Sequence, residues 1–449
     1  MKQRLISIPF FLLRTATAGA ALVTGLLQTY VFAHVLSPQR FSIFILVAAF
    51  GYSLWLIDFG IVKILFVRLR ARFLAGSQSD AVAGHATAVV LFYFALVSAG
   101  ALLCFIFMAA RTGASLREAA EFGLFFWSVA LNLVWFALRN IAIAVDEYVL
   151  FEALETVRRA GYFIGLAAVL LSLPLIVMLI ALNALWAVVV TICVRRMIAR
   201  GALKPRIGGF VADLVSFFRA NKAQLIRSGT FAASEIYVAN YPYLIVPMLF
   251  GLGAPPIILD TTFKVFRGGA TIFGAVCDIL VPRQTSALAE RDGPTLVHAT
   301  LMAAALCCIP AAIACAVLIL GADKLFAILL GNAATMPPAT TPILIVLLIA
   351  NLTQMVSNSV LVHNGYFREV ARIGMGVVAA MTGVGAFAIL AHLDIVQFLD
   401  AYVVVYTCGA IAAAVLMIRG PIRLAHEVVA PSEAAARSLS REHGAPAIR

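Results

Sequence analysis

Lys264 and Arg267 are the residues whose types and spacing point most directly to chemistry. They stand in a segment, 256–282, that is otherwise apolar apart from Asp260 and Asp278. A spacing of three places both side chains on one face of a helix. A guanidinium group binds phosphate oxygens through its planar fork of N–H donors, and an ammonium group adds a compact charge. The pair therefore predicts a site for an anionic group such as a diphosphate.

The same residues also have a purely structural interpretation. Asp260 precedes Lys264 by four residues, which is the spacing of an ion pair along a helix, and Arg267 can pair with Glu235 of the preceding span. The two interpretations are compatible, because a carboxylate can neutralise an empty cavity and a phosphate can displace it.

Further polar residues are candidates for sugar contact or for coupling to an ion. Glu235, Tyr237 and Asn240 follow one another in an apolar span whose middle should be loosened by Pro242. Glu235 is interpreted either as a proton or sodium coupling site or as a partner that locks two helices. Asp58 stands close to the inner end of another span and joins this group of candidates.

Arg14 is a third candidate for phosphate binding. It opens the first span within Leu12-Leu13-Arg14-Thr15-Ala16-Thr17, and a similar run, Leu225-Ile226-Arg227-Ser228-Gly229-Thr230, opens the seventh. Both spans are expected to start on the same side of the membrane. The match therefore indicates a parallel repeat of two halves, one of the recurring transporter architectures.

The composition places all these residues in a lipid environment. Of 449 residues, 63% are hydrophobic and 12% are charged, whereas soluble globular chains contain about 25% charged residues. A soluble fold, intrinsic disorder and a disulfide-stapled scaffold are thereby excluded. A charge within a membrane span costs roughly 2.5 to 3.5 kcal/mol, so it marks a pathway or a pair.

The apolar stretches predict an all-α polytopic membrane protein of about twelve transmembrane helices. A helix needs about 20 residues to cross the hydrocarbon core, and Pro174 should divide one long run into a hairpin of two spans. The expected spans fall within 15–39, 41–57, 81–110, 122–138, 160–194 (two spans), 236–259, 256–282, 293–322, 339–362, 373–393 and 401–418.

The distribution of basic residues predicts the orientation. With both termini in the cytoplasm, most of the 33 Lys and Arg residues fall in inner segments, as the positive-inside rule requires. Arg139, Arg158 and Arg159 are assigned to one of these inner segments. Anionic lipid headgroups then account for the net charge of +12 without any nucleic-acid partner.

Four regions are expected along the chain. Residues 1–196 form an N-terminal six-helix bundle, 197–227 a basic cytoplasmic linker, 228–418 a C-terminal six-helix bundle and 419–449 a cytoplasmic tail. The linker contains apolar and basic residues in a pattern that also fits an amphipathic helix at the membrane surface.

The sequence contains no motif of a known enzyme mechanism. The seven Cys and seven His residues lack the spacing of a metal or redox site, and no metalloprotease, nucleophile-elbow or phosphate-loop motif is present. We expect no enzymatic activity, no catalytic residue, no metal and no cofactor, with H⁺ or Na⁺ as the candidate coupling ion.

Two motifs resemble the opening of Wzx-type oligosaccharide flippases. These are Leu36-Ser37-Pro38-Gln39-Arg40-Phe41-Ser42, where Ser42 stands in place of the usual glycine, and Ile57-Asp58-Phe59-Gly60. Leu329-Leu330-Gly331 and Asn364-Gly365 are similar as well.

The resemblance implies a member of the multidrug/oligosaccharidyl-lipid/polysaccharide exporter superfamily. Such a protein has two six-helix bundles around a central cavity. It moves undecaprenyl-diphosphate-linked oligosaccharide across the bacterial inner membrane by alternating access, for assembly of a surface polysaccharide. Basic cavity residues would receive the diphosphate, and Lys264 and Arg267 match them by position. A polysaccharide polymerase or ligase would be a partner.

Other functions remain as alternatives. A multidrug or cation antiporter of the same fold would favour a carboxylate-rich cavity, whereas Glu235 is here the single deep carboxylate opposite two deep basic residues. A membrane polysaccharide polymerase usually needs a large outer loop, which the chain lacks, and a sugar acyltransferase is a further enzyme alternative. A scaffolding protein would use the deep charges as structural locks.

Overall fold

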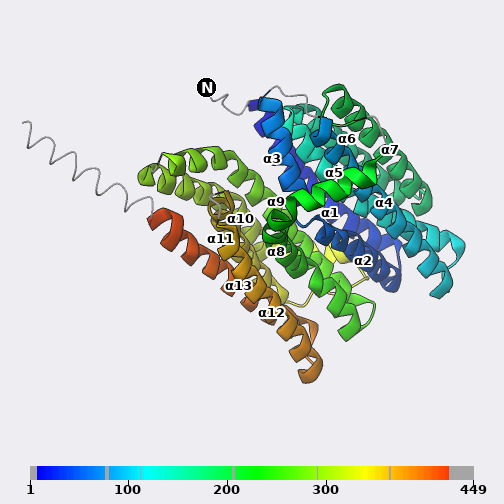
Figure 1. The fold of residues 1–449 in the computed structure, drawn as a ribbon. Helices are drawn as coiled ribbons and strands as arrows, with labels where there is room; N and C mark the ends of the chain where they lie inside the picture. The colour runs from blue at the N-terminus through cyan, green and yellow to red at the C-terminus, as the bar shows by residue number, and fades with distance from the viewer. Residues whose placement is uncertain are drawn as a thin grey trace, which may run out of the picture.

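The computed structural model describes residues 8–75, 80–111, 113–204, 208–290, 292–363 and 366–423. Every regular element within these ranges is a helix, so the all-α prediction is confirmed (Figure 1). The elements in chain order are α1 (Ile8–Val35), α2 (Pro38–Ser53), η1 (Leu54–Asp58), α3 (Ile61–Leu74), α4 (Asp80–Arg111), α5 (Leu116–Ala144), α6 (Tyr148–Leu170), α7 (Leu175–Ala199), α8 (Phe210–Phe250), α9 (Ala254–Ala289), α10 (Gly293–Leu330), α11 (Thr340–His363), α12 (Phe367–Ala391), α13 (Ile395–Met417) and η2 (Ile418–Ile422).

Nine helices of the described ranges are long and apolar enough to cross a membrane. The other three expected spans lie in α6, α8 and α9, which carry charged or polar residues along their lengths. The chain is thus a multi-pass membrane protein, and the count of twelve crossings stays a prediction.

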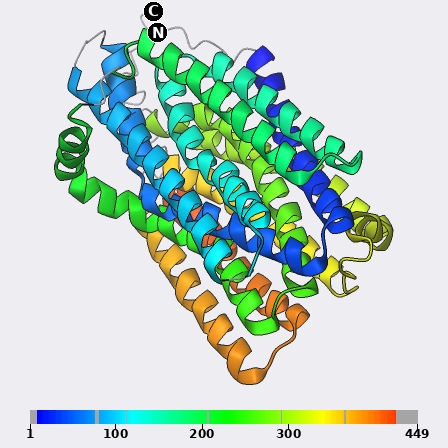
Figure 2. The same ribbon diagram turned by 90° about the vertical axis from the view of Figure 1, so that its right-hand side faces the viewer.

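The helices form two lobes (Figures 1 and 2). The N-lobe contains α1 to α7, coloured blue to teal, and the C-lobe contains α8 to α13, coloured green to orange. Helix α1 lies between the lobes, because it packs on α6 of its own lobe and on α9 of the other. Packing of long helices from both halves therefore creates the interface in which polar side chains can be held.

Helix α8 begins inside the segment expected as a linker. It runs from Phe210 without interruption to Phe250, through both Pro242 and Pro247. Its first turns lie against α4, where Ser216 Oγ is 2.8 Å from His85 Nε2. Most of the expected linker is thus helical and rests on the N-lobe, as the amphipathic pattern allowed.

One proline and one glycine interrupt the helical course of the chain. Pro174 separates α6 from α7, which confirms the predicted division into two helices, whereas a membrane crossing by α6 stays a prediction. Gly321 interrupts α10 with non-helical dihedral angles, and the chain beyond it is again helical to Leu330. Neither residue supports a regular helix well, since proline lacks the N–H donor and glycine has the greatest backbone freedom.

The two motifs that carry the family resemblance start helices. Ser37 accepts a hydrogen bond from the Arg40 N–H, and Pro38 is the first residue of α2, which is the usual chemistry of a helix start. Asp58 accepts hydrogen bonds from the N–H groups of Gly60 and Val62 at the start of α3. The φ angle of Gly60 is 76°, in the left-handed region that glycine adopts without strain.

Arg158 and Arg159 lie within α6, ten and eleven residues after its first residue. Their assignment to an inner segment of the topology stays a prediction. Both guanidinium groups pair with Glu155 of the same helix, and a hydropathy pattern alone does not reveal such pairing.

Candidate functional site

A cavity of about 170 Å³ lies between the two lobes. Helices α1, α2 and α5 of the N-lobe form one wall, and α8 and α9 form the other. Its polar lining residues are Gln28, Tyr52, Tyr243, Asp260, Lys264, Arg267 and Thr271. The structure therefore brings the two predicted phosphate-binding residues of α9 to one interlobe cavity.

Lys264 connects the lobes at this cavity. Its Nζ atom lies 2.6 Å from Asp260 Oδ2 and donates a hydrogen bond of 2.8 Å to the Thr29 hydroxyl of α1. Asp260 also accepts a hydrogen bond of 3.2 Å from the Tyr243 hydroxyl. The ion pair expected along α9 is thus present, and Lys264 is partly neutralised by it.

Arg267 is held by neutral groups. Its Nη2 atom donates hydrogen bonds to Ala239 O at 3.0 Å and to Asn240 Oδ1 at 3.2 Å. The guanidinium carbon lies 5.3 Å from the centre of the Tyr52 ring and 4.9 Å from that of Tyr243, distances at which an aromatic face attracts a cation.

No ion pair joins Arg267 to a carboxylate in the part of the chain that the structure describes. The expected pair between Arg267 and Glu235 is therefore wrong. The positive charge of Arg267 is stabilised by neutral hydrogen-bond acceptors and by the faces of two aromatic rings among the described residues.

A second cavity of about 250 Å³ lies within the C-lobe, between α8, α9, α11, α12 and α13. Arg267 and Glu235 both line it, together with Gln354, Asn358, Tyr402 and Tyr406. Glu235 is exposed to this space and accepts a hydrogen bond of 3.1 Å from Asn358 Nδ2. Glu235 is therefore directed to α11 rather than to Arg267.

Arg267 lines both cavities, and no other charged residue of either lining does so. A group bound in the interlobe cavity would contact the same guanidinium that borders the C-lobe cavity.

The remaining candidates lie outside the two cavities. Asn240 supports Arg267, whereas Tyr237 hydrogen-bonds Thr382 of α12 at 2.9 Å and stacks on Tyr241. Asp58 is buried at the start of α3, where the Tyr93 hydroxyl donates a further bond of 2.7 Å. The structure does not bring Tyr237 or Asp58 to the basic pair.

The prediction for Arg14 lies outside what the structure describes. Its backbone belongs to α1, but its side chain falls outside the described residues. The same holds for the side chain of Arg227, its counterpart in the repeat.

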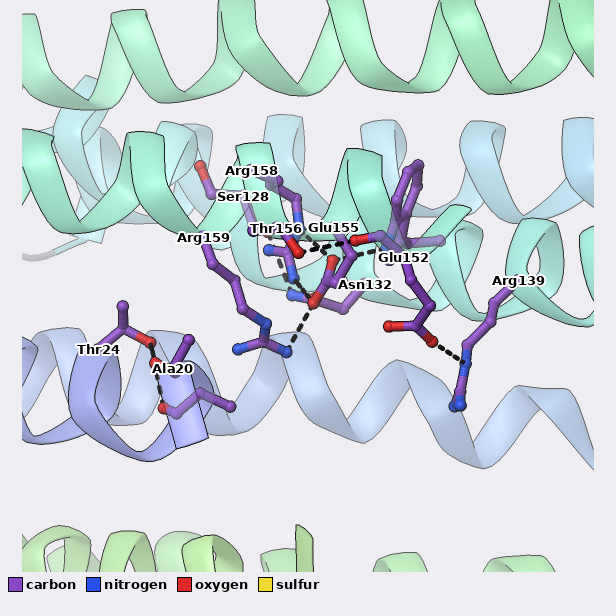
Figure 3. Close-up of polar contacts among 12 residues, drawn as sticks. Ala20, Thr24, Ser128, Asn132, Arg139, Glu152, Glu155, Thr156, Arg158 and Arg159 are labelled. Carbon is purple, nitrogen blue, oxygen red and sulfur yellow. Dashed lines mark hydrogen bonds and ion pairs between the residues drawn. The ribbon is translucent and has the colours of Figure 1, made fainter. Parts of the chain in front are cut away.

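Sequence reasoning missed a cluster of charges inside the N-lobe (Figure 3). Glu155 of α6 pairs with Arg158 at 2.7 Å and with Arg159 at 2.6 Å, and Glu152 lies 3.9 Å from Arg139 of α5. The signal was present in the spacing, because charges at positions 152, 155, 158 and 159 recur at three to four residues and so share one helix face.

Among the residues described, no group of three His, Cys, Asp or Glu side chains is arranged to hold a metal ion. The charged groups of the interlobe cavity can bind a ligand by electrostatic attraction. One ammonium group, one guanidinium group and one carboxylate face a space bordered by aromatic rings. This arrangement suits the binding of an anion.

Comparison with known proteins identifies the fold. No protein-family model and no curated protein sequence matches the chain. The eukaryotic MATE transporter AtDTX14 is similar in structure, with a TM-score of 0.62 and 14% identity over 93% of this chain and 98% of that chain. An inward-facing multidrug resistance MATE family transporter of the MOP superfamily has a TM-score of 0.61 and 11% identity over 91% of this chain and 95% of that one.

A third similar structure is a MOP superfamily transporter from Pyrococcus furiosus, for which reverse polarity of the binding pocket suggests a different function. Its TM-score is 0.53, with 11% identity over 93% of this chain and 99% of that chain. The chain described here therefore has the MATE-like fold of two helical lobes.

Proposed function

We propose that this protein is a membrane transporter that moves a polyprenyl-diphosphate-linked oligosaccharide across the bacterial inner membrane by alternating access. The lipid carrier would be undecaprenyl diphosphate, and the product would serve the assembly of a surface polysaccharide. The observation that carries this proposal is Arg267, a cation at the interlobe cavity that pairs with no carboxylate among the described residues.

The charge of the interlobe cavity supports an anionic substrate. Asp260 compensates Lys264, so the lining of the cavity keeps the positive charge of Arg267. A guanidinium group has five N–H donors, and the hydrogen bonds of Arg267 to Ala239 and Asn240 both come from Nη2. A phosphate oxygen is a good acceptor for the donors that remain.

The similar structures support transport, because the solved proteins of this fold cited above are transporters. The reverse polarity reported for the binding pocket of the Pyrococcus furiosus protein supports the idea that this fold can accept substrates of different charge. We propose transport rather than catalysis for this chain.

Glu235 is proposed as the coupling residue, with H⁺ or Na⁺ as the ion. Its carboxylate faces the C-lobe cavity, where Asn358 donates to it, and Arg267 borders the same space. Binding of an ion at Glu235 would thus change the electrostatic environment of Arg267, the residue that receives the diphosphate. A polymerase or ligase would then take over the transported sugar.

The proposal is tested by Arg267→Ala and Arg267→Lys in cells that depend on this protein for surface polysaccharide. Lipid-linked sugar at the outer leaflet is measured with a membrane-impermeant reagent. Arg267→Ala should abolish exposure of the sugar at normal expression, and Arg267→Lys should restore part of it because the charge returns without the fork. Normal surface polysaccharide in Arg267→Ala would reject the proposal.

A multidrug or cation antiporter is the second candidate function. It is favoured by Glu235, a carboxylate exposed to the larger of the two central cavities. Efflux of a lipophilic cation separates the candidates, because Glu235→Gln should abolish such efflux whereas Arg267→Ala should leave it intact or increase it.

A further inference from the structure

The N-lobe contains a third cavity, of about 160 Å³, between α1, η1, α5 and α6. We call it the arginine pocket. Its polar lining residues are Thr17, Trp55, Asn132, Trp135, Arg139, Glu152, Glu155, Arg158 and Arg159. A single water needs only about 10–15 Å³ of such space, so the pocket is large enough for a group of several heavy atoms.

One carboxylate compensates two guanidinium groups in this pocket. Glu155 accepts hydrogen bonds of 2.8 and 2.7 Å from Nε and Nη2 of Arg158, and Arg159 Nη2 lies 2.6 Å from the same carboxylate. The indole N–H of Trp135 adds a fourth bond of 2.8 Å. The acceptor capacity of Glu155 is therefore filled.

A positive charge remains after this pairing. Glu152 lies 3.9 Å from Arg139 Nε and compensates that residue, so three arginines face two carboxylates in the pocket. Figure 3 shows the two carboxylates between the guanidinium groups of Arg139 and Arg159. A net positive charge in a partly buried space favours an anion as its occupant.

Two donors of the pocket have no acceptor. Arg159 Nε and Trp55 Nε1 are buried and make no hydrogen bond among the residues that the structure describes. Both residues line the arginine pocket. A buried donor without an acceptor is unfavourable, and an anion with several oxygen atoms can satisfy donors from η1 and α6 at once.

The arginine pocket lies about one helical turn from the interlobe cavity. Three helical segments contribute neighbouring residues to the two linings: Ala21 and Thr17 from α1, Tyr52 and Trp55 from α2 and η1, and Val129 and Asn132 from α5. Each pair is three or four residues apart, or about 5 Å along a helix.

In each of the three pairs, the residue of the arginine pocket lies closer to the same end of the lobe, which contains the start of α1 and the ends of η1 and α5. This is the end of the lobe that the distribution of basic residues predicts to be cytoplasmic. Tyr52 lines the interlobe cavity, three residues before Trp55 of the arginine pocket, and its ring lies 5.3 Å from the guanidinium carbon of Arg267.

We propose that the arginine pocket is a second phosphate-binding site, in which Arg159 and Trp55 receive a diphosphate group at the cytoplasmic end of the interlobe cavity. The group then passes to Arg267 and Lys264. The identity of the lipid that carries the diphosphate rests on the proposed function, whereas recognition of the phosphate rests on the pocket itself.

The test uses the full-length protein in detergent and the fluorescence of its tryptophans. Trp127→Phe is the parent, because it leaves Trp55, Trp135 and Trp186, of which two line the pocket and the third contacts Arg158. The probes are inorganic pyrophosphate, farnesyl diphosphate and farnesol. Both phosphates should change the fluorescence in a saturable way, and farnesol should not.

Arg159→Gln should weaken the affinity for pyrophosphate at least tenfold. Asn132→Asp is the second variant, because it adds a carboxylate to the pocket without removing the pair between Glu155 and Arg159, and it should weaken binding similarly. This variant decides the outcome if Arg159→Gln fails to fold. Tighter binding of farnesyl diphosphate than of pyrophosphate would identify a lipid as the source, and equal binding would identify free phosphate.

Arg117→Gln is the matched control, because Arg117 is an exposed arginine near the start of α5 that does not line the pocket. It should leave the fluorescence change in place. Transport by Arg267→Ala tests the proposed function and pyrophosphate binding tests the second site, so failure of one proposal is distinguishable from failure of the other. A fluorescence change that farnesol reproduces, no change with either phosphate, or full affinity in a folded Asn132→Asp protein would overturn the second site.

Discussion

The hydroxyl of Ser42 joins the two lobes through the backbone of Gly253. Its Oγ atom lies 2.8 Å from the carbonyl oxygen of Gly253 and accepts a hydrogen bond of 2.9 Å from the N–H of the same residue. Ser42 belongs to α2 and is fully buried, and Gly253 stands between α8 and α9 with a φ angle of 131°. Only glycine enters this backbone region readily, so the contact depends on both residue types.

Alternating access would require this contact to break when the outer side opens. We expect Ser42→Ala to favour the outward-open form about tenfold, since the two hydrogen bonds contribute roughly 1 to 3 kcal/mol together. The measurement is the rate at which a membrane-impermeant thiol reagent, added outside, labels Ala48→Cys in the interlobe cavity. Ser53→Ala is the control, because the Ser53 hydroxyl bonds within its own helix to Ala49 O. Equal labelling of the two serine variants would show that the contact does not hold the outer side closed.

Asp260 and Lys264 should be coupled energetically. Removal of one partner leaves a buried charge uncompensated and costs about 3 to 5 kcal/mol, whereas removal of both leaves none. We expect Asp260→Asn to lower the free energy of unfolding more than the double variant Asp260→Asn/Lys264→Met does. A double-mutant cycle in detergent measures the difference, and additive effects of the two substitutions would contradict it.

Glu235→Gln separates coupling from helix locking. The amide keeps an oxygen that can accept the bond from Asn358, so the melting temperature should change little. We expect ion-gradient-driven movement of lipid-linked sugar in proteoliposomes to fall at least tenfold. Glu118→Gln, at the start of α5, is the control, since glutamine also completes the capping box there. A lower melting temperature with undiminished transport would instead assign Glu235 a locking role.

Stability should depend on pH through Glu147, which precedes α6 and lies outside the spans. Burial opposes its ionisation, but hydrogen bonds and charges from Arg196 and Arg200 outweigh burial and lower the pKa of Glu147 below the usual value of 4.5. A carboxylate with a lower pKa in the folded state stabilises the fold above its unfolded pKa and loses this contribution as the pH falls through the folded one. Glu147→Gln should therefore lower the melting temperature at pH 7 and have a smaller effect at acidic pH, below the usual pKa of 4.5. A difference from the parent that does not shrink on acidification would contradict this.

Much of the fold could be predicted because it depends on local properties of the chain. Apolar runs of sufficient length specify membrane helices, and Pro174 ends one of them whatever surrounds it. The pair between Asp260 and Lys264 was predictable for the same reason, since a spacing of four residues in a helix fixes their proximity.

Only the tertiary structure decided which groups meet across helices. Arg267 lies against Ala239, Asn240 and Tyr52 instead of Glu235, because the rotation of α8 about its axis is set by packing against α9 and α12 rather than by its own sequence. The arginine pocket likewise combines Trp55 with Arg159, residues about one hundred positions apart. Periodicity along one helix determines which side chains share a face, and the neighbour that this face meets is determined by how the helices pack together.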